Sequence, residues 1–180
     1  EFYEKYPEGI KGLIFSGPFF STELWEKDAD TLISYLSDSV QNIIAKAEES
    51  KQFDTKEYQF ADSIYWSKYG RRHPWPEHPL DTLEVSGNSF IYNYMWGPSE
   101  FTALGTLKNY DNTEALKSIE VPVLFIAGEF DEARTETVKY FNSLVPNSRM
   151  AIIPDAGHSS MTDNSEEYLA ALETFIDRSD

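Results

Sequence analysis

The chain has 180 residues, 41% of them hydrophobic and 26% charged, a balance typical of one packed domain or of a core with a small insertion. It contains no cysteine, which excludes disulfide frameworks and thiolate metal sites, and we expect a reducing, cytoplasmic location. Its net charge of −16 repels phosphate backbones and anionic lipids, so we expect neither nucleic acid nor membrane as a partner, whereas a cationic ligand is favoured.

The first predicted element is a short buried strand near the start of the sequence. An apolar run from Ile10 to Ser16 is closed by Gly17 and Pro18, a pattern typical of a strand that ends in a turn. No basic and apolar leader precedes it, so we expect no signal peptide. Because a buried strand needs neighbours on both sides, we expect the natural protein to begin earlier than this numbering.

The middle of the chain predicts a helical cap inserted into the fold. Between residues 22 and 69, apolar side chains recur at steps of three and four, as in amphipathic helices, with a polar connection at 46–51. Three prolines within six positions prevent a helix at 71–79, which we expect to be a rigid surface loop or a pocket wall. Its two histidines and one glutamate lack further ligands, so no metal is expected. We assign residues 21–108 to the cap.

The last part of the chain alternates strands and helices. The predicted order is a strand at 121–128, a helix at 135–144, a strand at 150–154 and a helix at 166–176. This alternation is typical of a parallel α/β sheet that is covered on both faces. We therefore assign residues 1–20 and 109–180 to an α/β core, with the cap inserted between them.

Two of these strands end in residues capable of chemistry. Asp131 follows the strand that ends at Ala127, and His158 follows the strand that ends at Ile153. Ligands gather beyond the carboxyl ends of parallel strands, where such a pair could be the orienting acid and the general base of a nucleophilic triad. Taken singly, an Asp after a strand is commonly a turn residue, and a His in a glycine loop is commonly solvated. The two together, in the Asp-then-His order of α/β hydrolases, favour the triad.

A family resemblance rests on four stretches of the sequence. These are Gly97–Phe101, Gly105–Lys108, Val121–Glu132 and Ala156–Met161. Through them the chain resembles the C-terminal part of the proline iminopeptidases (prolyl aminopeptidases), which are lid-bearing serine peptidases of the α/β-hydrolase fold. The Gly-Pro-x-Glu-Phe and Gly-Glu-x-Asp-Glu elements are more specific than the Gly-His element, which many α/β hydrolases share. The resemblance implies release of N-terminal proline from short peptides, without a metal or organic cofactor.

The same resemblance implies roles for individual residues. Asp131 and His158 would be the acid and base of the triad. Glu100 and Glu132 would bind the free α-amino group of the substrate, since two carboxylates facing one ammonium form charge-assisted hydrogen bonds. Without the resemblance, each glutamate would be interpreted as an acid in the first turn of a helix.

The abundant aromatic side chains offer flat walls for a proline ring. The candidates are Trp66, Tyr69, Trp75, Phe90, Tyr92, Tyr94 and Trp96. For the substrate pocket we name Trp75, Tyr94 and Trp96. The alternative is that these rings hold the helical cap together, as large aromatics do in ordinary cores.

The nucleophile of the family is missing from these 180 residues. No serine stands in a Gly-x-Ser-x-Gly elbow, and Ser16, Ser89 and Ser159 all lack the flanking pattern. We therefore expect a further segment of the same protein to carry the serine, and we expect this chain alone to be inactive. Two alternatives remain open: an amino-acid amidase or esterase of the same fold, and a non-catalytic remnant that binds amines.

Overall fold

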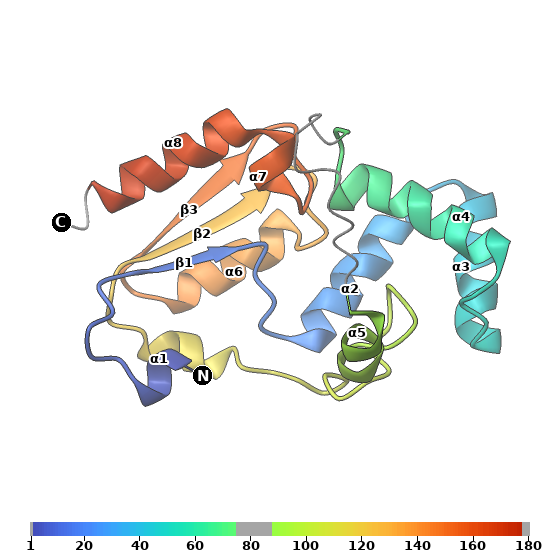
Figure 1. Cartoon of the computed structure of the whole chain (residues 1–180), viewed down its shortest axis with the longest axis horizontal. Coiled ribbons are helices and arrows are strands. Elements are labelled where there is room, and N and C mark those ends of the chain that lie inside the picture. Colours follow the sequence, from blue (N-terminus) through green and yellow to red (C-terminus); the bar gives the residue numbers. More distant parts are fainter. Residues whose placement is uncertain (1, 75–87, 178–180) are drawn as a thin grey trace.

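The centre of the fold is a three-stranded parallel sheet (Figure 1). The computed structural model describes residues 2–74 and 88–177. The strands are β1 (Leu13–Ser16), β2 (Val123–Gly128) and β3 (Ser148–Ile153), and they lie side by side in that order. Every residue of β2 is buried, because it has a strand on each side and a helix on each face. The continuous apolar run of this strand follows from that position.

Helices cover the two faces of the sheet. Successive side chains of a strand point to opposite faces, so β2 contributes to two separate cores. Phe125 packs in one core with the buried side of α6 (Thr135–Leu144), and Ile126 packs in the other with α8 (Ser165–Ile176). Figure 1 shows α6 and α8 on opposite sides of the sheet. The predicted parallel α/β class is confirmed.

Five of the described helices between β1 and β2 form a separate layer, which we call the cap. They are α2 (Thr22–Ile33), α3 (Asp38–Ser50), α4 (Lys56–Tyr65), a π-helix (Trp66–Gly70) and α5 (Ser89–Met95). The first four share a core in which Ala61 and Tyr65 are fully enclosed. In Figure 1 the cap lies beyond the carboxyl ends of the strands. The boundaries assigned above, 1–20, 21–108 and 109–180, stay a prediction.

One predicted connection is in fact helical. The polar stretch at 46–51 was expected to link two helices, but α3 continues through it to Ser50. Ala47 extends the buried stripe of Val40 and Ile44, and its polar neighbours lie on the solvent side. The helix ends at Lys51, whose left-handed backbone (φ 56°) cannot continue it.

Three short helices complete the described chain. They are α1 (Phe2–Lys5), a 3₁₀ helix (Glu114–Ser118) and α7 (Ser160–Asp163). Residues 71–74 are not helical, as the three prolines of 71–79 predicted, and 75–79 lie outside the described residues. Within the described ranges, no helix combines the length and apolarity that a bilayer crossing requires.

Candidate active site

Asp131 lies in the turn that follows β2 and is held by that turn. Its carboxylate accepts hydrogen bonds from the backbone N–H groups of Gly128 (3.1 Å, to Oδ2) and Ala133 (2.9 Å, to Oδ1). The side chain is buried, with only 2% of the residue exposed. Two backbone donors fix the orientation of the acid, and Oδ1 also faces the loop after β3.

His158 lies in that neighbouring loop, with its imidazole against Asp131. The distance from Nδ1 to Asp131 Oδ1 is 2.9 Å. An ionised carboxylate only accepts hydrogen bonds, so Nδ1 donates, and Nε2 is left as the nitrogen that can take up a proton. Burial lowers the pKa of His158, but the hydrogen bond and charge of Asp131, with the charges of two nearby glutamates, raise it to about 9. Once this proton is lost, the arrangement suits an orienting acid and a general base.

Gly17, at the end of β1, allows the backbone to approach the imidazole closely. Its φ of +54° lies in the left-handed region that favours glycine. A Cβ on this residue would lie 2.5 Å from Cε1 of His158. Trp25 of α2 meets the same ring edge-on, with the centroids 5.7 Å apart. The carboxyl ends of all three strands therefore converge on His158.

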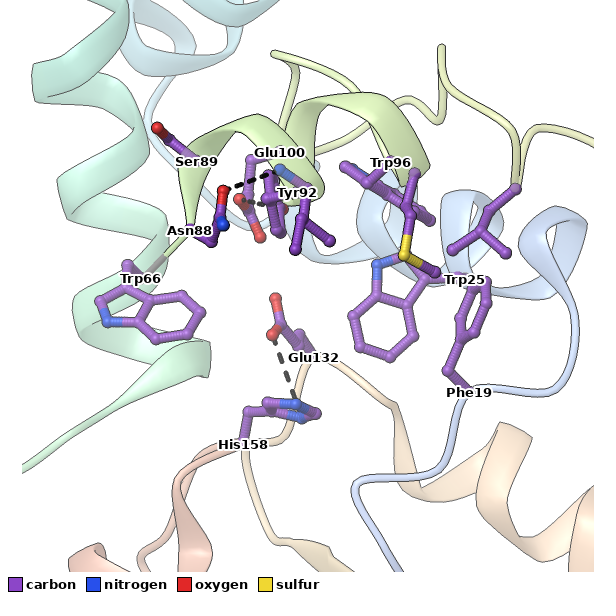
Figure 2. Close-up of a pocket in the computed structure, with 13 residues that line it drawn as sticks. Phe19, Trp25, Trp66, Asn88, Ser89, Tyr92, Trp96, Glu100, Glu132 and His158 are labelled. Atoms are coloured by element: carbon purple, nitrogen blue, oxygen red, sulfur yellow. Dashed lines mark hydrogen bonds and ion pairs between the residues drawn. The ribbon is translucent and has the colours of Figure 1, made fainter. Parts of the chain in front are cut away.

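A cavity of about 840 Å³ opens above the histidine, between the core and the cap (Figure 2). Its walls are mainly apolar and aromatic, and they include Phe19, Trp25, Trp66, Tyr92, Met95 and Trp96. Glu132 and His158 reach it from the core, and Glu100 reaches it from the cap. A cavity of this size with few polar groups is typical of small-molecule sites.

The two glutamates face a cavity in which His158 is the one basic side chain among the described lining residues. Glu132 is buried, and its Oε1 lies 3.9 Å from Nδ1 of His158. Burial raises the pKa of Glu132 to about 8, against the opposing effect of the His158 charge. Burial, with the charge of Asp62, raises the pKa of Glu100 to about 7. No lysine or arginine of the described residues lines the cavity. The site therefore offers negative charge to a cation that enters from solvent.

Glu100 is positioned by two tyrosines of the cap. Its backbone N–H donates to the hydroxyl of Tyr58 (2.9 Å), and the hydroxyl of Tyr92 donates to its Oε2 (3.0 Å). The interpretation of either glutamate as a first-turn helix acid is wrong. Glu132 precedes α6, which begins at Thr135, and Glu100 follows α5.

The predicted aromatic wall is only partly the one observed. Trp96 lines the cavity, and its indole N–H donates to the carbonyl of Ser99 (2.8 Å). Tyr94 is not in the wall, because α5 turns this side chain to solvent, where it is 64% exposed. Trp75 lies outside the described residues. The sequence reasoning missed Phe19 and Trp25, although Phe19 follows the turn after β1, where ligands are expected.

The fold and the site define the class of protein. A parallel sheet with an acid after one strand, a histidine after the next and a helical cap above them is the C-terminal part of the α/β-hydrolase fold. Solved structures agree. VinJ superimposes with a TM-score of 0.86 at 28% identity, over 97% of this chain and 60% of that one. A proline iminopeptidase from Mycobacterium smegmatis superimposes with a TM-score of 0.84 at 25% sequence identity. The match covers 97% of this chain and 59% of that one.

Sequence comparison identifies the relatives. A proline iminopeptidase from Heyndrickxia coagulans is 39% identical over 171 residues, which are 94% of this chain and 59% of that protein. The chain therefore resembles the C-terminal part of the proline iminopeptidases over nearly its whole length. It spans about three fifths of the length of the relatives that it matches. No protein-family model matches it.

Proposed function

We propose that the complete protein is a serine aminopeptidase that releases proline from the N-terminus of short peptides. The observation that carries the proposal is the Asp131–His158 pair at 2.9 Å, directly beneath a cavity that presents the carboxyl groups of Glu100 and Glu132. The similarity to the C-terminal part of proline iminopeptidases supports it. We place the complete enzyme in the cytoplasm, where it would act on free peptides.

In this proposal His158 moves the proton and Asp131 holds the ring. Nε2 of His158 takes the proton from a serine hydroxyl as that oxygen attacks the carbonyl carbon of the prolyl residue. The imidazolium then gives the proton to the departing amine nitrogen, and a water molecule repeats the sequence to release proline. We assign the serine and the oxyanion donors to a part of the protein outside these 180 residues, so this chain alone should not hydrolyse peptides.

Glu100 and Glu132 would select a free N-terminus. In the empty cavity their raised pKa values, about 7 and about 8, keep at least one carboxyl protonated near neutral pH. A substrate ammonium favours both ionised forms and forms charge-assisted hydrogen bonds with them, so its binding should release a proton. A blocked N-terminus brings no charge, so it forms no charge-assisted hydrogen bonds with the two groups and does not favour their ionised forms.

The aromatic walls would hold the proline ring. Trp25 and Trp96 lie edge-on to each other, with centroids 6.4 Å apart, and Trp66 stands across the cavity (Figure 2). These flat apolar surfaces suit a small saturated ring with little polarity of its own. The pocket therefore accommodates the proline side chain while the two glutamates anchor its nitrogen.

The test compares a free prolyl amide with its N-acetyl form on the complete protein. We expect acetylation to lower kcat/KM by at least roughly 100-fold, because a desolvated charge loses its partner. A His158→Gln variant is the control for background hydrolysis. Equal hydrolysis of the two substrates would instead identify an amino-acid amidase or esterase. Binding of the amine without any turnover by the complete protein would identify a non-catalytic remnant.

A further inference from the structure

We propose that Asp163 is a positioning residue that fastens the loop of His158 to the cap. It lies at the end of α7, outside the cavity, and is not one of the residues predicted for the site. The expected effect of Asp163 on kcat rests on the proposed function. Its expected effect on the position and titration of His158 does not.

The backbone of the His158 loop is bound to the cap. The N–H of His158 donates to the carbonyl of Tyr69 (2.8 Å), and the N–H of Ser159 donates to that of Gly70 (2.7 Å). Strand β3 ends at Ile153, so no sheet ladder holds these two amides. Gly157 completes the close approach, since a Cβ there would lie 2.7 Å from the Tyr69 carbonyl oxygen. The position of the histidine therefore depends on a segment of the cap.

Asp163 joins the same two segments through a single carboxylate. On the cap side it accepts hydrogen bonds from the backbone N–H groups of Arg72 (3.0 Å, to Oδ2) and His73 (3.0 Å, to Oδ1). On the loop side Oδ2 accepts from the N–H of Gly157 (2.9 Å), the residue before the histidine. Hydrogen bonds to an ionised acceptor are stronger than neutral ones. Oδ2 contacts both segments, and Oδ1 adds a second hydrogen bond from the cap.

A second, outer contact between cap and loop is weaker. The guanidinium of Arg72 donates to Oδ1 of Asp155 (3.1 and 3.2 Å) and lies over the ring of Phe130, 3.8 Å from its centroid. The carboxylate of Asp155 is 61% exposed, and exposed ion pairs contribute about 0–1 kcal/mol. We therefore assign the main fastening to Asp163 and not to this pair.

The fastened segment also carries a wall of the cavity. The π-helix Trp66–Gly70 supplies Trp66 to the pocket and its last carbonyl to Ser159. Isolated π-helical turns are frequent at functional sites. One end of this short segment thus supplies a pocket wall and the other end holds the loop of His158, and Asp163 fixes the same segment to the core.

The test uses Asp163→Asn, which keeps the volume but replaces one acceptor oxygen with an amino group that cannot accept. Asp111→Asn is the matched control: its Oδ1 accepts from the backbone and hydroxyl of Thr113 and does not contact the His158 loop. The readout is the imidazole titration of His158 by NMR, assigned with His158→Gln. We expect the pKa of His158 to fall from about 9 toward its ordinary value in Asp163→Asn, and to stay in place in Asp111→Asn.

The kinetic readout is made on the complete protein. We expect Asp163→Asn to lower kcat roughly 10- to 100-fold with a smaller change in KM, because a displaced base affects chemistry more than binding. A folded Asp163→Asn protein with the titration and kcat of the parent would overturn the proposal.

A measurement on the unsubstituted protein tests the proposal even if the Asp163→Asn variant does not fold. The amides of Gly157, His158 and Ser159 should be protected from hydrogen exchange far beyond exposed loop amides. Exchange at loop rates would overturn the proposal. Titration and exchange need no turnover, so they decide this inference even if the complete protein hydrolyses no peptide.

Discussion

Replacing Glu132 with Gln should stabilise the empty protein at alkaline pH while removing its selection for a free amine. The carboxyl is buried and has no cationic side chain other than His158 within 4 Å in the described residues. An amide of the same shape carries no charge that the apolar cavity must accommodate. The variant thus measures two effects of the carboxylate separately: the loss of folding stability in the empty site and the gain in binding of a free amine.

The sign and size of the change in the free energy of unfolding follow from the shifted pKa of Glu132. Burial raises the pKa of Glu132 from 4.5 to about 8, so the folded state binds this proton more tightly than the unfolded state. The resulting stability is complete below about pH 4.5 and is lost as pH rises through 8. The full shift corresponds to roughly 5 kcal/mol at most. Part of this is offset, because the variant also loses the attraction between Glu132 and protonated His158. We therefore expect Glu132→Gln to gain about 2–4 kcal/mol over the parent between pH 5 and pH 9.

The assay is urea unfolding at pH 5, 7 and 9. Glu114→Gln is the matched control, because Glu114 is exposed and pairs with Lys117 at the surface, so its effect should stay small at every pH. Adding L-prolinamide should raise the stability of the parent and not that of Glu132→Gln. The reasoning is refuted if the variant is no more stable than the parent at pH 9, or if its advantage does not grow with pH.

Three further substitutions test the other parts of the site. Asp131→Asn should lower kcat of the complete protein roughly 10⁴-fold in a prolyl amide assay, because the amide no longer enforces the tautomer of His158; a loss under tenfold would remove the acid from the triad. Tyr92→Phe deletes the hydroxyl that donates to Glu100 (3.0 Å), and KM for a free-amine substrate should rise about fivefold in steady-state kinetics. An unchanged KM would show that this hydrogen bond does not support amine binding. Gly157→Ala should cost about 1–3 kcal/mol in urea unfolding, since its Cβ would press on a cap carbonyl. Unchanged stability would mean that the cap and the loop separate in solution.

The fold was largely predictable because its strands and helices differ in the spacing of their apolar residues. Fully buried strands are continuous apolar runs, and helices place apolar residues three and four apart, so β2 and α6 were expected close to their observed bounds. The error at residues 46–51 has a simple cause. Polar side chains on the solvent face of α3 resemble a loop when only composition is considered.

Site residues could be predicted from the sequence only where the order of the strands determines which side chains lie close together. Asp131 and His158 follow neighbouring strands, so the sheet itself brings them together. Glu100 could be identified only through a resemblance, since nothing in its local sequence shows that it faces a cavity. Asp163 gives no signal at all: beside a short helix it looks like any terminal acid, and two of its three amide partners, Arg72 and His73, are about 90 residues away in the sequence.

The order of the elements separates the cap from the Asp131–His158 pair. The cap leaves the sheet after β1 and returns before β2, whereas Asp131 and His158 both come later, in the connections that follow two strands held about 4.8 Å apart by backbone hydrogen bonds. A different cap could therefore change the shape of the cavity without altering the spacing of Asp131 and His158. Such an exchange carries one condition. The incoming segment must present two carbonyls to the histidine loop and two amides to Asp163, in the places of Tyr69–His73. Recombination between relatives, in nature or in the laboratory, should preserve that short junction while the rest of the cap varies.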